Sequence, residues 1–333
     1  MKKLINHVDA VVNEMLDGMV AAYPKYIRRL SPDLQVIVRA DAPVKGKVAL
    51  ISGGGSGHEP SHAGFVGHGM LDAGVAGEVF TSPTPDQIFE GIKAIDGGAG
   101  VLMIIKNYTG DVMNFEMAGE MAEAEGIEVA HVVVNDDVAV QDSLYTTGRR
   151  GVAGTVFVHK IAGAKAQAGG SLAEVKAVAE KVIANVRTMG MALTPCTVPA
   201  AGKPTFTLAE DEMEVGIGIH GEPGTHREEL RPVDEVVAHM MEKIINDLPY
   251  KAGDEVAVMV NGMGATPLME LFIMNRKVSE ILKEAGIKVY RTFVGEYMTS
   301  LEMAGASITL LKLDAELKEL LDAPADTPAF TQF

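Results

Sequence analysis

The sequence predicts an α/β protein made of two α/β domains, with mostly parallel or mixed sheets flanked by helices. Short unbroken apolar runs, which suit strands buried on both faces, alternate with segments of helical periodicity. The length of 333 residues corresponds to about two domains at roughly 150 residues each. A stretch with three prolines, Leu193–Pro204, interrupts the pattern between two similar parts of the chain. We expect the domains to span 1–186 and 187–333.

The first half alternates the two kinds of segment in order. The expected strands are the apolar runs 47–52, 101–106 and 128–134. The expected helices are 7–21, 85–94, 112–125 and one or two helices within 151–190. Thr84, followed by Pro85, has the pattern of a helix N-cap with proline at the first helical position.

The second half repeats this arrangement. The expected strands are 213–219, 255–261, 288–294 and 307–313, and the expected helices are 233–246 and 267–285. Val256–Pro267 echoes Val48–Pro60, because each is an apolar run, then a glycine-containing loop, then a proline. Thr266 before Pro267 is a second predicted N-cap.

Composition limits the partners. Lys and Arg number 29 against 45 Asp and Glu, a formal net charge of −16, which argues against nucleic acid or an acidic membrane surface as the main partner. No apolar run approaches the roughly 18 residues that span a bilayer. The single cysteine, Cys196, cannot form an intrachain disulfide and is typical of a reducing compartment. We therefore expect a cytoplasmic protein without a membrane partner.

The densest signal is the stretch Gly53–Pro60, which holds four glycines, a serine and a histidine at the end of an expected strand. Glycines there let backbone approach a ligand at the carboxyl edge of an α/β sheet, whereas a single glycine would indicate only a tight turn. No Gly-Lys-Ser/Thr follows, so the stretch is not a phosphate loop of the Walker type. We expect no nucleotide site of that class in the chain.

The segment His58–His62 formally matches the zinc protease pattern H-E-x-x-H. That chemistry needs both histidines on one helix, and Pro60 lies between them. We interpret Pro60 as the start of a helix that leaves His58 in the preceding loop, and we expect no metal site.

Other candidate residues have ordinary structural explanations beside functional ones. Gly216–Gly221 matches the dinucleotide pattern G-x-G-x-x-G, but turn residues follow it instead of a helix, which leaves His220 among glycines with room for a small ligand. Asp111 follows an expected strand, where a carboxylate either caps the next helix or accepts a substrate proton. The pairs 136–137 (Asp-Asp) and 149–150 (Arg-Arg) are interpreted as solvated surface charges.

Several contiguous motifs resemble one family, the dihydroxyacetone-binding subunits (DhaK) of bacterial phosphotransferase-dependent dihydroxyacetone kinases. The motifs are Leu50–Pro60, Phe80–Pro85, Ile105–Asp111, Asp142–Tyr145, Gly148–Gly151, Cys196–Pro204 and Gly216–Gly224. The likeness runs from Met1 to about Pro328, and no motif position departs from the family pattern.

The resemblance implies two α/β domains, a homodimer and a specific chemistry. It implies that His220 bonds covalently to the carbonyl carbon of dihydroxyacetone as a hemiaminal, with His58 and Asp111 assisting proton transfer at the reacting hydroxyl. The residues implied to line the substrate are Gly55, Ser56, Gly57, His58, Lys106 and Asp111.

The resemblance also implies partners. The phosphoryl group would come from a nucleotide-binding kinase subunit (DhaL-like), which carries ADP or ATP with Mg and is recharged by a phosphotransferase-system donor subunit (DhaM-like). No cofactor is expected on this chain. A paralogous co-activator, which senses dihydroxyacetone and binds a transcription factor without catalysis, is the alternative, since it would share the fold and could keep His220. The joint presence of His58, Lys106 and Asp111 favours catalysis.

Overall fold

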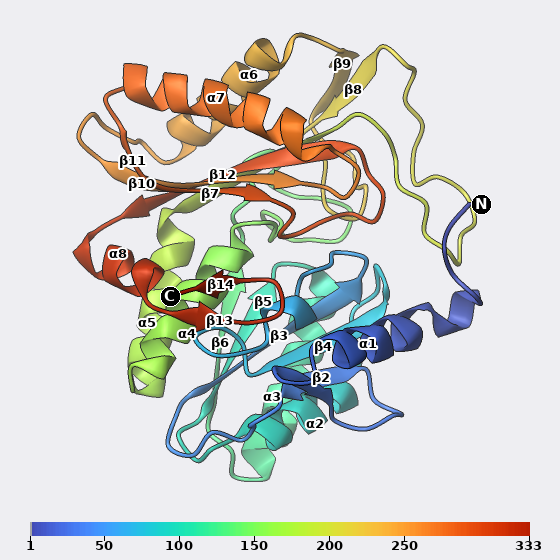
Figure 1. The fold of residues 1–333 in the computed structure, drawn as a ribbon, viewed down its shortest axis with the longest axis vertical. Helices are drawn as coiled ribbons and strands as arrows, with labels where there is room; N and C mark the ends of the chain where they lie inside the picture. The colour runs from blue at the N-terminus through green and yellow to red at the C-terminus, as the bar shows by residue number, and fades with distance from the viewer. Residues whose placement is uncertain (1) are drawn as a thin grey trace.

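Two six-stranded sheets lie one above the other in the computed structural model, which describes residues 2–333. Figure 1 shows helices outside each sheet and a further group of helices between the sheets. This layered arrangement of mixed sheets and helices confirms the α/β fold class.

The first sheet is mainly parallel. Its strands are β1 (Ile27–Arg29), β2 (Val36–Arg39), β3 (Ala49–Ser56), β4 (Ala73–Val79), β5 (Val101–Lys106) and β6 (Val129–Val134). In the order β1-β2-β4-β3-β5-β6, the last four are parallel, and β2 pairs antiparallel with both β1 and β4. Helices α2 (Pro85–Ile95) and α3 (Thr109–Ala124) pack together on its outer face (Figure 1).

The second sheet is mostly antiparallel. Its strands are β7 (Val186–Ala192), β8 (Glu212–Val215), β9 (His226–Glu229), β10 (Glu255–Gly262), β11 (Lys288–Gly295) and β12 (Gly305–Leu313). They follow the order β11-β10-β12-β7-β8-β9, in which β10 and β11 are the parallel pair. Helices α6 (Val233–Asp247) and α7 (Leu268–Glu284) cover its outer face.

The remaining elements lie outside the two sheets. In chain order they are η1 (Val8–Ala10), α1 (Val11–Ala22), η2 (Ala63–Phe65), α4 (Thr155–Gln167), α5 (Leu172–Asn185), α8 (Ala315–Asp322), β13 (Ala325–Asp326) and β14 (Thr331–Gln332). Of these, α4 and α5 are the helices between the two sheets (Figure 1). Helices α4 and α5 pack against each other, and α4 also packs against α8.

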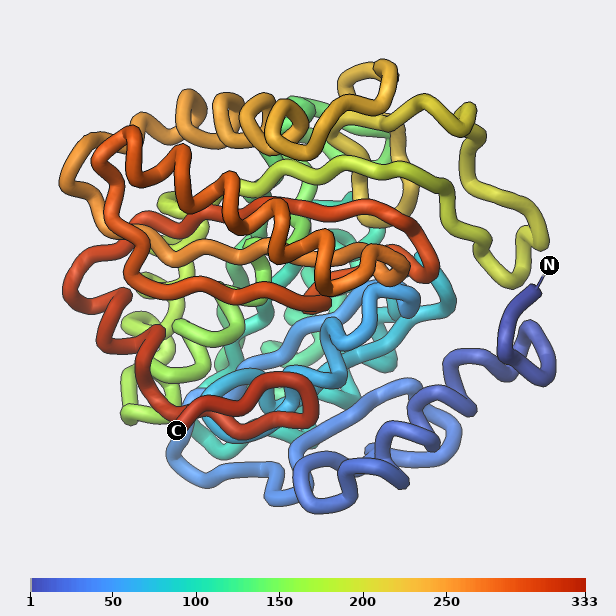
Figure 2. The backbone as a smooth tube through the Cα atoms, turned by 45° about the horizontal axis from the view of Figure 1, so that its top comes forward, coloured from blue at the N-terminus to red at the C-terminus, as the bar shows by residue number. Residues whose placement is uncertain are grey.

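The largest apolar core joins the two sheets. One cluster of buried side chains contains Leu102 of β5, Val178 of α5 and Leu311 of β12. The two halves therefore share a core through the helices between them. Figure 2 shows the C-terminal segment returning to the first half, where Asp326 pairs with His68.

Most expected elements are present, and the differences have local causes. The apolar runs 47–52, 101–106 and 128–134 fall in β3, β5 and β6, and Thr84 caps α2 as predicted, because its hydroxyl accepts the Gln87 N–H. The prediction of helices throughout 151–190 is wrong after residue 185, because β7 begins directly after α5 with no breaking residue between them. The strand expected over 213–219 ends at Val215, because Gly216 adopts a positive φ of 77°.

Two predicted helix starts are also wrong. Pro60 does not begin an α-helix; tertiary hydrogen bonds hold this segment instead, from Ser61 Oγ to the Tyr297 carbonyl (2.9 Å) and from Thr299 Oγ1 to the Glu59 carbonyl (2.8 Å). Thr266 does not cap α7, because its hydroxyl exchanges hydrogen bonds with the backbone of Gly305.

Candidate active site

The carboxyl end of β3 meets residues from two other parts of the chain. Gly55 is buried there, and a Cβ at this position would lie 2.5 Å from the Thr81 nitrogen and 2.7 Å from the Phe80 Cα. A Cβ at Gly54 would lie 2.4 Å from the Lys106 ammonium. These glycines therefore allow the loop after β4 and the end of β5 to approach the strand closely.

His58 and His220 come together from opposite halves of the molecule. Their Nε2 atoms are 3.0 Å apart, and the rings meet edge to face. Phe80 stacks on His58, while Tyr108 packs edge to face against His220. His58 is fully buried, and His220 is partly exposed to a cavity.

The hydrogen-bond partners determine which ring nitrogens carry protons. His58 Nδ1 lies 2.9 Å from the Thr299 carbonyl and His220 Nδ1 lies 3.0 Å from Glu222 Oε1, so each Nδ1 is a donor. If both rings were neutral, each Nε2 would be unprotonated, and the two Nε2 lone pairs would face each other. A hydrogen bond at 3.0 Å requires one shared proton, so the pair carries one positive charge.

His58 is held neutral by its surroundings, and a carboxylate lies beside His220. Burial, followed by the charges of His220 and Lys106, holds the pKa of His58 well below its usual range. Glu222 lies against His220, and although burial alone would raise the pKa of this carboxyl, His220 and Arg150 lower it to about 2. The carboxylate is therefore the counter-charge of the imidazolium.

Asp111 and Lys106 form a second polar group in the site. Asp111 lies in the first turn of α3, where its Oδ1 accepts the Ser82 hydroxyl at 2.5 Å and its Oδ2 is 3.7 Å from Lys106 Nζ. It does not cap α3, so the capping interpretation is wrong; the helix begins after Tyr108, too early for that role. Lys106 also contacts the Gly53 carbonyl and His62 Nε2.

A cavity of about 700 Å³ opens over this group of residues. Gly55, Asp111 and His220 line it, together with Phe80 and Tyr108. The other residues singled out by sequence lie around it in different ways. His58 and Lys106 are buried behind the lining, Ser56 donates its hydroxyl to the Gly77 carbonyl, and Gly57 accommodates Phe80 and Leu301.

His58 and His62 do not converge. His58 bonds His220, whereas His62 Nδ1 lies 3.0 Å from His159 Nε2 deeper in the core. Within residues 2–333 no group of three His, Cys, Asp or Glu side chains has the arrangement of a metal site. None of the helices in this part of the chain is long and apolar enough to cross a membrane.

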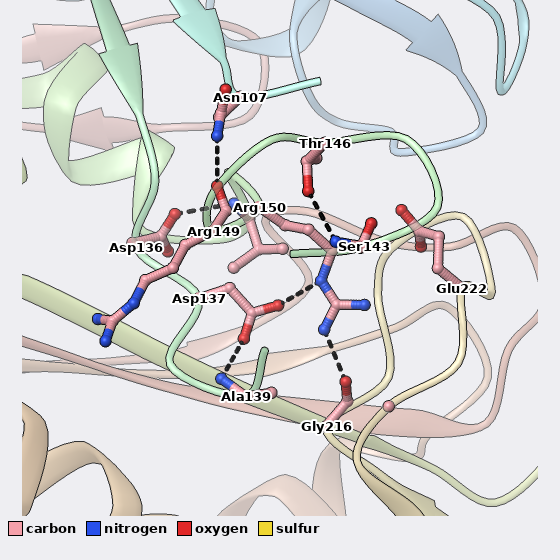
Figure 3. Close-up of polar contacts among 12 residues, drawn as sticks. Asn107, Asp136, Asp137, Ala139, Ser143, Thr146, Arg149, Arg150, Gly216 and Glu222 are labelled. Atoms are coloured by element: carbon pink, nitrogen blue, oxygen red, sulfur yellow. Dashed lines mark hydrogen bonds and ion pairs between the residues drawn. The ribbon is translucent and has the colours of Figure 1, made fainter. Parts of the chain in front are cut away.

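The charge pairs at 136–137 and 149–150 are not solvated, so that interpretation is wrong for most of their members. Asp136, Asp137 and Arg150 are at most 1% exposed, and Figure 3 shows their polar contacts. Each finds a partner distant in sequence, because Asp136 accepts the Val152 and Gly154 N–H groups and Asp137 binds Arg150. These partners lie on loops that come together only in the folded chain, so the sequence pattern did not predict the contacts.

Glu222, Tyr108 and Phe80 are site residues that sequence reasoning did not single out. All three lie inside quoted motifs. Glu222 follows His220 by two positions across a turn, and this H-x-E spacing was the available signal.

The chain is similar to known proteins over nearly its whole length. Residues 17–329 match the model of the Dak1 domain. The chain is 58% identical over 331 residues to "PTS-dependent dihydroxyacetone kinase 1, dihydroxyacetone-binding subunit DhaK" of Listeria innocua, covering 99% of this chain and 100% of that one.

Two solved structures share the fold. The "Dihydroxyacetone kinase operon co-activator Dha-DhaQ" superposes with a TM-score of 0.91 at 37% identity, over 98% of this chain and 99% of that one. The dihydroxyacetone kinase of C. freundii gives a TM-score of 0.89 at 35% identity, over 99% of this chain and 60% of that one.

Proposed function

The chain belongs to the Dak1 family, and from this membership and its site we propose that it is the dihydroxyacetone-binding subunit of a dihydroxyacetone kinase. The observation that carries the proposal is the His58–His220 contact at 3.0 Å beside a cavity that Asp111 also lines. A nucleophile and a carboxylate base thus face one small volume, and a proton carrier lies against the nucleophile.

Capture of the substrate uses His220. Its shared proton passes to His58, which frees the Nε2 lone pair to form a bond with the carbonyl carbon of dihydroxyacetone. The carbonyl π electrons move to oxygen, and His58 returns the proton to that oxygen. The product is a neutral hemiaminal hydroxyl on a ring that keeps one positive charge next to Glu222, so the net charge of the site is unchanged.

Covalent capture suits a substrate this small. Dihydroxyacetone has few atoms, and the binding energy available from non-covalent contacts is limited by atom count. A bond to its carbonyl carbon adds affinity and selects against glycerol, which has no carbonyl group. It also holds the terminal hydroxyl in a fixed position for an incoming phosphoryl group.

Phosphoryl transfer uses Asp111. The carboxylate lines the cavity and is held by Ser82, so it can accept the proton of the terminal hydroxyl as that oxygen attacks phosphorus. Lys106, 3.7 Å away, balances its charge. Gly55, which lines the cavity, lets the loop that carries Phe80 pack closely against the end of β3.

The phosphoryl donor is a separate nucleotide-loaded subunit that carries ADP or ATP with Mg and is recharged by a phosphotransferase-system protein. The lack of any Gly-Lys-Ser/Thr phosphate loop in the sequence supports this division. The chain acts as a homodimer in the cytoplasm. The exposed apolar side chains of α7 support an assembly, and the single buried cysteine supports a reducing compartment.

The second candidate is a dihydroxyacetone-sensing co-activator, which the fold similarity to the co-activator structure favours. The identity of 37% to that protein is well below the 58% to the Listeria kinase subunit. The catalytic carboxylate and its Ser82 contact also favour the kinase subunit, because a sensor has no need to deprotonate its ligand.

Phosphotransfer tests the proposal. The chain is mixed with the nucleotide-loaded subunit from the same organism, its recharging protein and dihydroxyacetone, and dihydroxyacetone phosphate is quantified. Product that depends on this chain supports the kinase subunit. The partner subunit is first shown to be active with another dihydroxyacetone-binding subunit. Tight binding of dihydroxyacetone to this chain without product would then favour the co-activator.

A further inference from the structure

We propose that Glu222 is the positioning residue for His220, and that Arg150 anchors the turn that carries His220 and places a positive charge near the Glu222 carboxylate. This inference rests on the proposed covalent capture and adds the groups that prepare the nucleophile. Glu222 contacts the Nδ1 side of the imidazole, whereas its Nε2 faces His58.

Glu222 fixes His220 through two contacts. Its Oε1 accepts from Nδ1 at 3.0 Å and its Oε2 accepts the backbone N–H of His220 at 2.8 Å. The Glu222 side chain is 1% exposed. A carboxylate that accepts at both oxygens leaves the ring one orientation and one tautomer, with Nδ1 protonated and Nε2 directed at His58.

Arg150 reaches this turn from the other half of the molecule. Its Nη2 donates to the Gly216 carbonyl at 2.7 Å, while its Nε is held by Asp137 at 2.7 Å (Figure 3). Arg150 is fully buried, so its position is fixed by these partners. The guanidinium therefore anchors the start of the turn from Gly216 to Gly224 that places His220.

Gly218 leaves room for both Arg150 and Glu222 beside the turn. A Cβ at this position would lie 2.1 Å from Glu222 Oε2 and 2.8 Å from Arg150 Nη1. Only a glycine lets both charged groups approach the same point of the backbone. The positive charge of the Arg150 guanidinium stabilises the Glu222 carboxylate. Burial, followed by the charge of Glu222, raises the pKa of Tyr108, so its phenol is neutral where it packs against the His220 ring.

The consequence for capture is electrostatic as well as geometric. An imidazole with Nδ1 protonated becomes positively charged when its Nε2 bonds to carbon, and the Glu222 carboxylate beside Nδ1 stabilises that charge without moving. The backbone N–H and Nδ1 of His220 face separate oxygens of Glu222, and an amide in its place would turn an NH2 donor toward one of these two donors. The ring would then lose its fixed tautomer and its counter-charge.

The test uses the E222Q variant and a matched control, E228Q. His226 and Glu228 repeat the H-x-E spacing at the surface, with 3.7 Å between His226 Nε2 and Glu228 Oε2. Two readouts are taken on the full-length protein: the affinity for [2-¹³C]dihydroxyacetone from its tetrahedral carbon signal, and the ¹⁵N spectrum of His220 without ligand.

We expect E222Q to bind at least tenfold more weakly and to lose the signal of a protonated, hydrogen-bonded His220 Nδ1, with E228Q unchanged. An unaltered affinity and Nδ1 signal in E222Q would overturn the inference. If E222Q does not fold, E222D retains the charge but shortens the side chain, and an unchanged Nδ1 signal there would equally contradict it. Absence of the tetrahedral carbon in the unmodified protein would refute covalent capture itself, while the ligand-free ¹⁵N spectrum still tests the positioning role.

Discussion

Replacing Asp111 by Asn separates substrate capture from phosphoryl transfer. The amide keeps an acceptor for the Ser82 hydroxyl, which lies 2.5 Å from Oδ1, and removes the negative charge that faces the cavity. His220 forms its bond at the carbonyl carbon and not at the reacting hydroxyl, so capture should persist within a few-fold. Turnover should fall by about 10²- to 10⁴-fold, the usual contribution of a positioned general base, or about 3–5 kcal/mol in activation free energy.

The same substitution has a structural cost that must be measured separately. A carboxylate in the first turn of a helix contributes about 0.3–1 kcal/mol through the helix dipole, and Asp111 occupies that turn of α3. Lys106 also loses its negative neighbour but keeps the Gly53 carbonyl and His62 as partners. A modest fall in melting temperature is therefore expected.

The assay measures dihydroxyacetone phosphate formation with the partner subunit, alongside the tetrahedral carbon signal for capture. The matched control is E120Q, which neutralises an exposed carboxylate on the same helix and should change neither quantity. Turnover within threefold of the unmodified protein would refute the base role of Asp111. Parallel losses of capture and turnover would show that the substitution acts through binding instead.

Three further substitutions, with G18A as a control for one of them, test other parts of the account. H58N should slow the exchange between free and captured dihydroxyacetone by about 10²-fold, because it removes the proton carrier, and ¹³C exchange spectroscopy would measure this; an unchanged rate would contradict the role. G55A should lower both the melting temperature and the affinity for dihydroxyacetone, because its Cβ would lie 2.7 Å from the Phe80 Cα. The control G18A adds a Cβ at an open helix position and should stabilise the protein by about 1 kcal/mol. Burial lowers the pKa of Lys160 to about 8, so below pH 8 the folded state holds a buried charge that destabilises it. The free energy of unfolding should therefore rise by up to about 3 kcal/mol between pH 8 and 10.5. Denaturation of the unmodified protein and of K160M across this pH range checks the prediction, because K160M should lack this rise.

The sequence predicted the strands that are buried on both faces, because their composition reflects that environment directly. The run 101–106 is β5 in full, and all six of its residues are buried. Strand β7 was missed since Val186–Ala192 continues from α5 without a glycine or proline to mark the change. Its strand conformation comes from pairing with β12, which is more than a hundred residues away.

Some residues of the site were predicted from the sequence and others were not. His58, Asp111 and His220 stand at the ends of strands or in glycine-rich turns, so motif reasoning found them. Arg150 and Asp137 looked like surface charges because each has a like-charged neighbour in sequence. Their burial depends on an ion pair of 2.7 Å and on carbonyls of the turn at Gly216, contacts that only the folded chain creates.

The central claim is that His220 captures dihydroxyacetone covalently, and the most direct measurement is the ¹³C spectrum of [2-¹³C]dihydroxyacetone bound to this protein. We predict a tetrahedral carbon signal in place of the ketone signal, lost in H220A but retained in D111N. A bound ketone carbon in the unmodified protein, or a tetrahedral signal that survives in H220A, would contradict the claim.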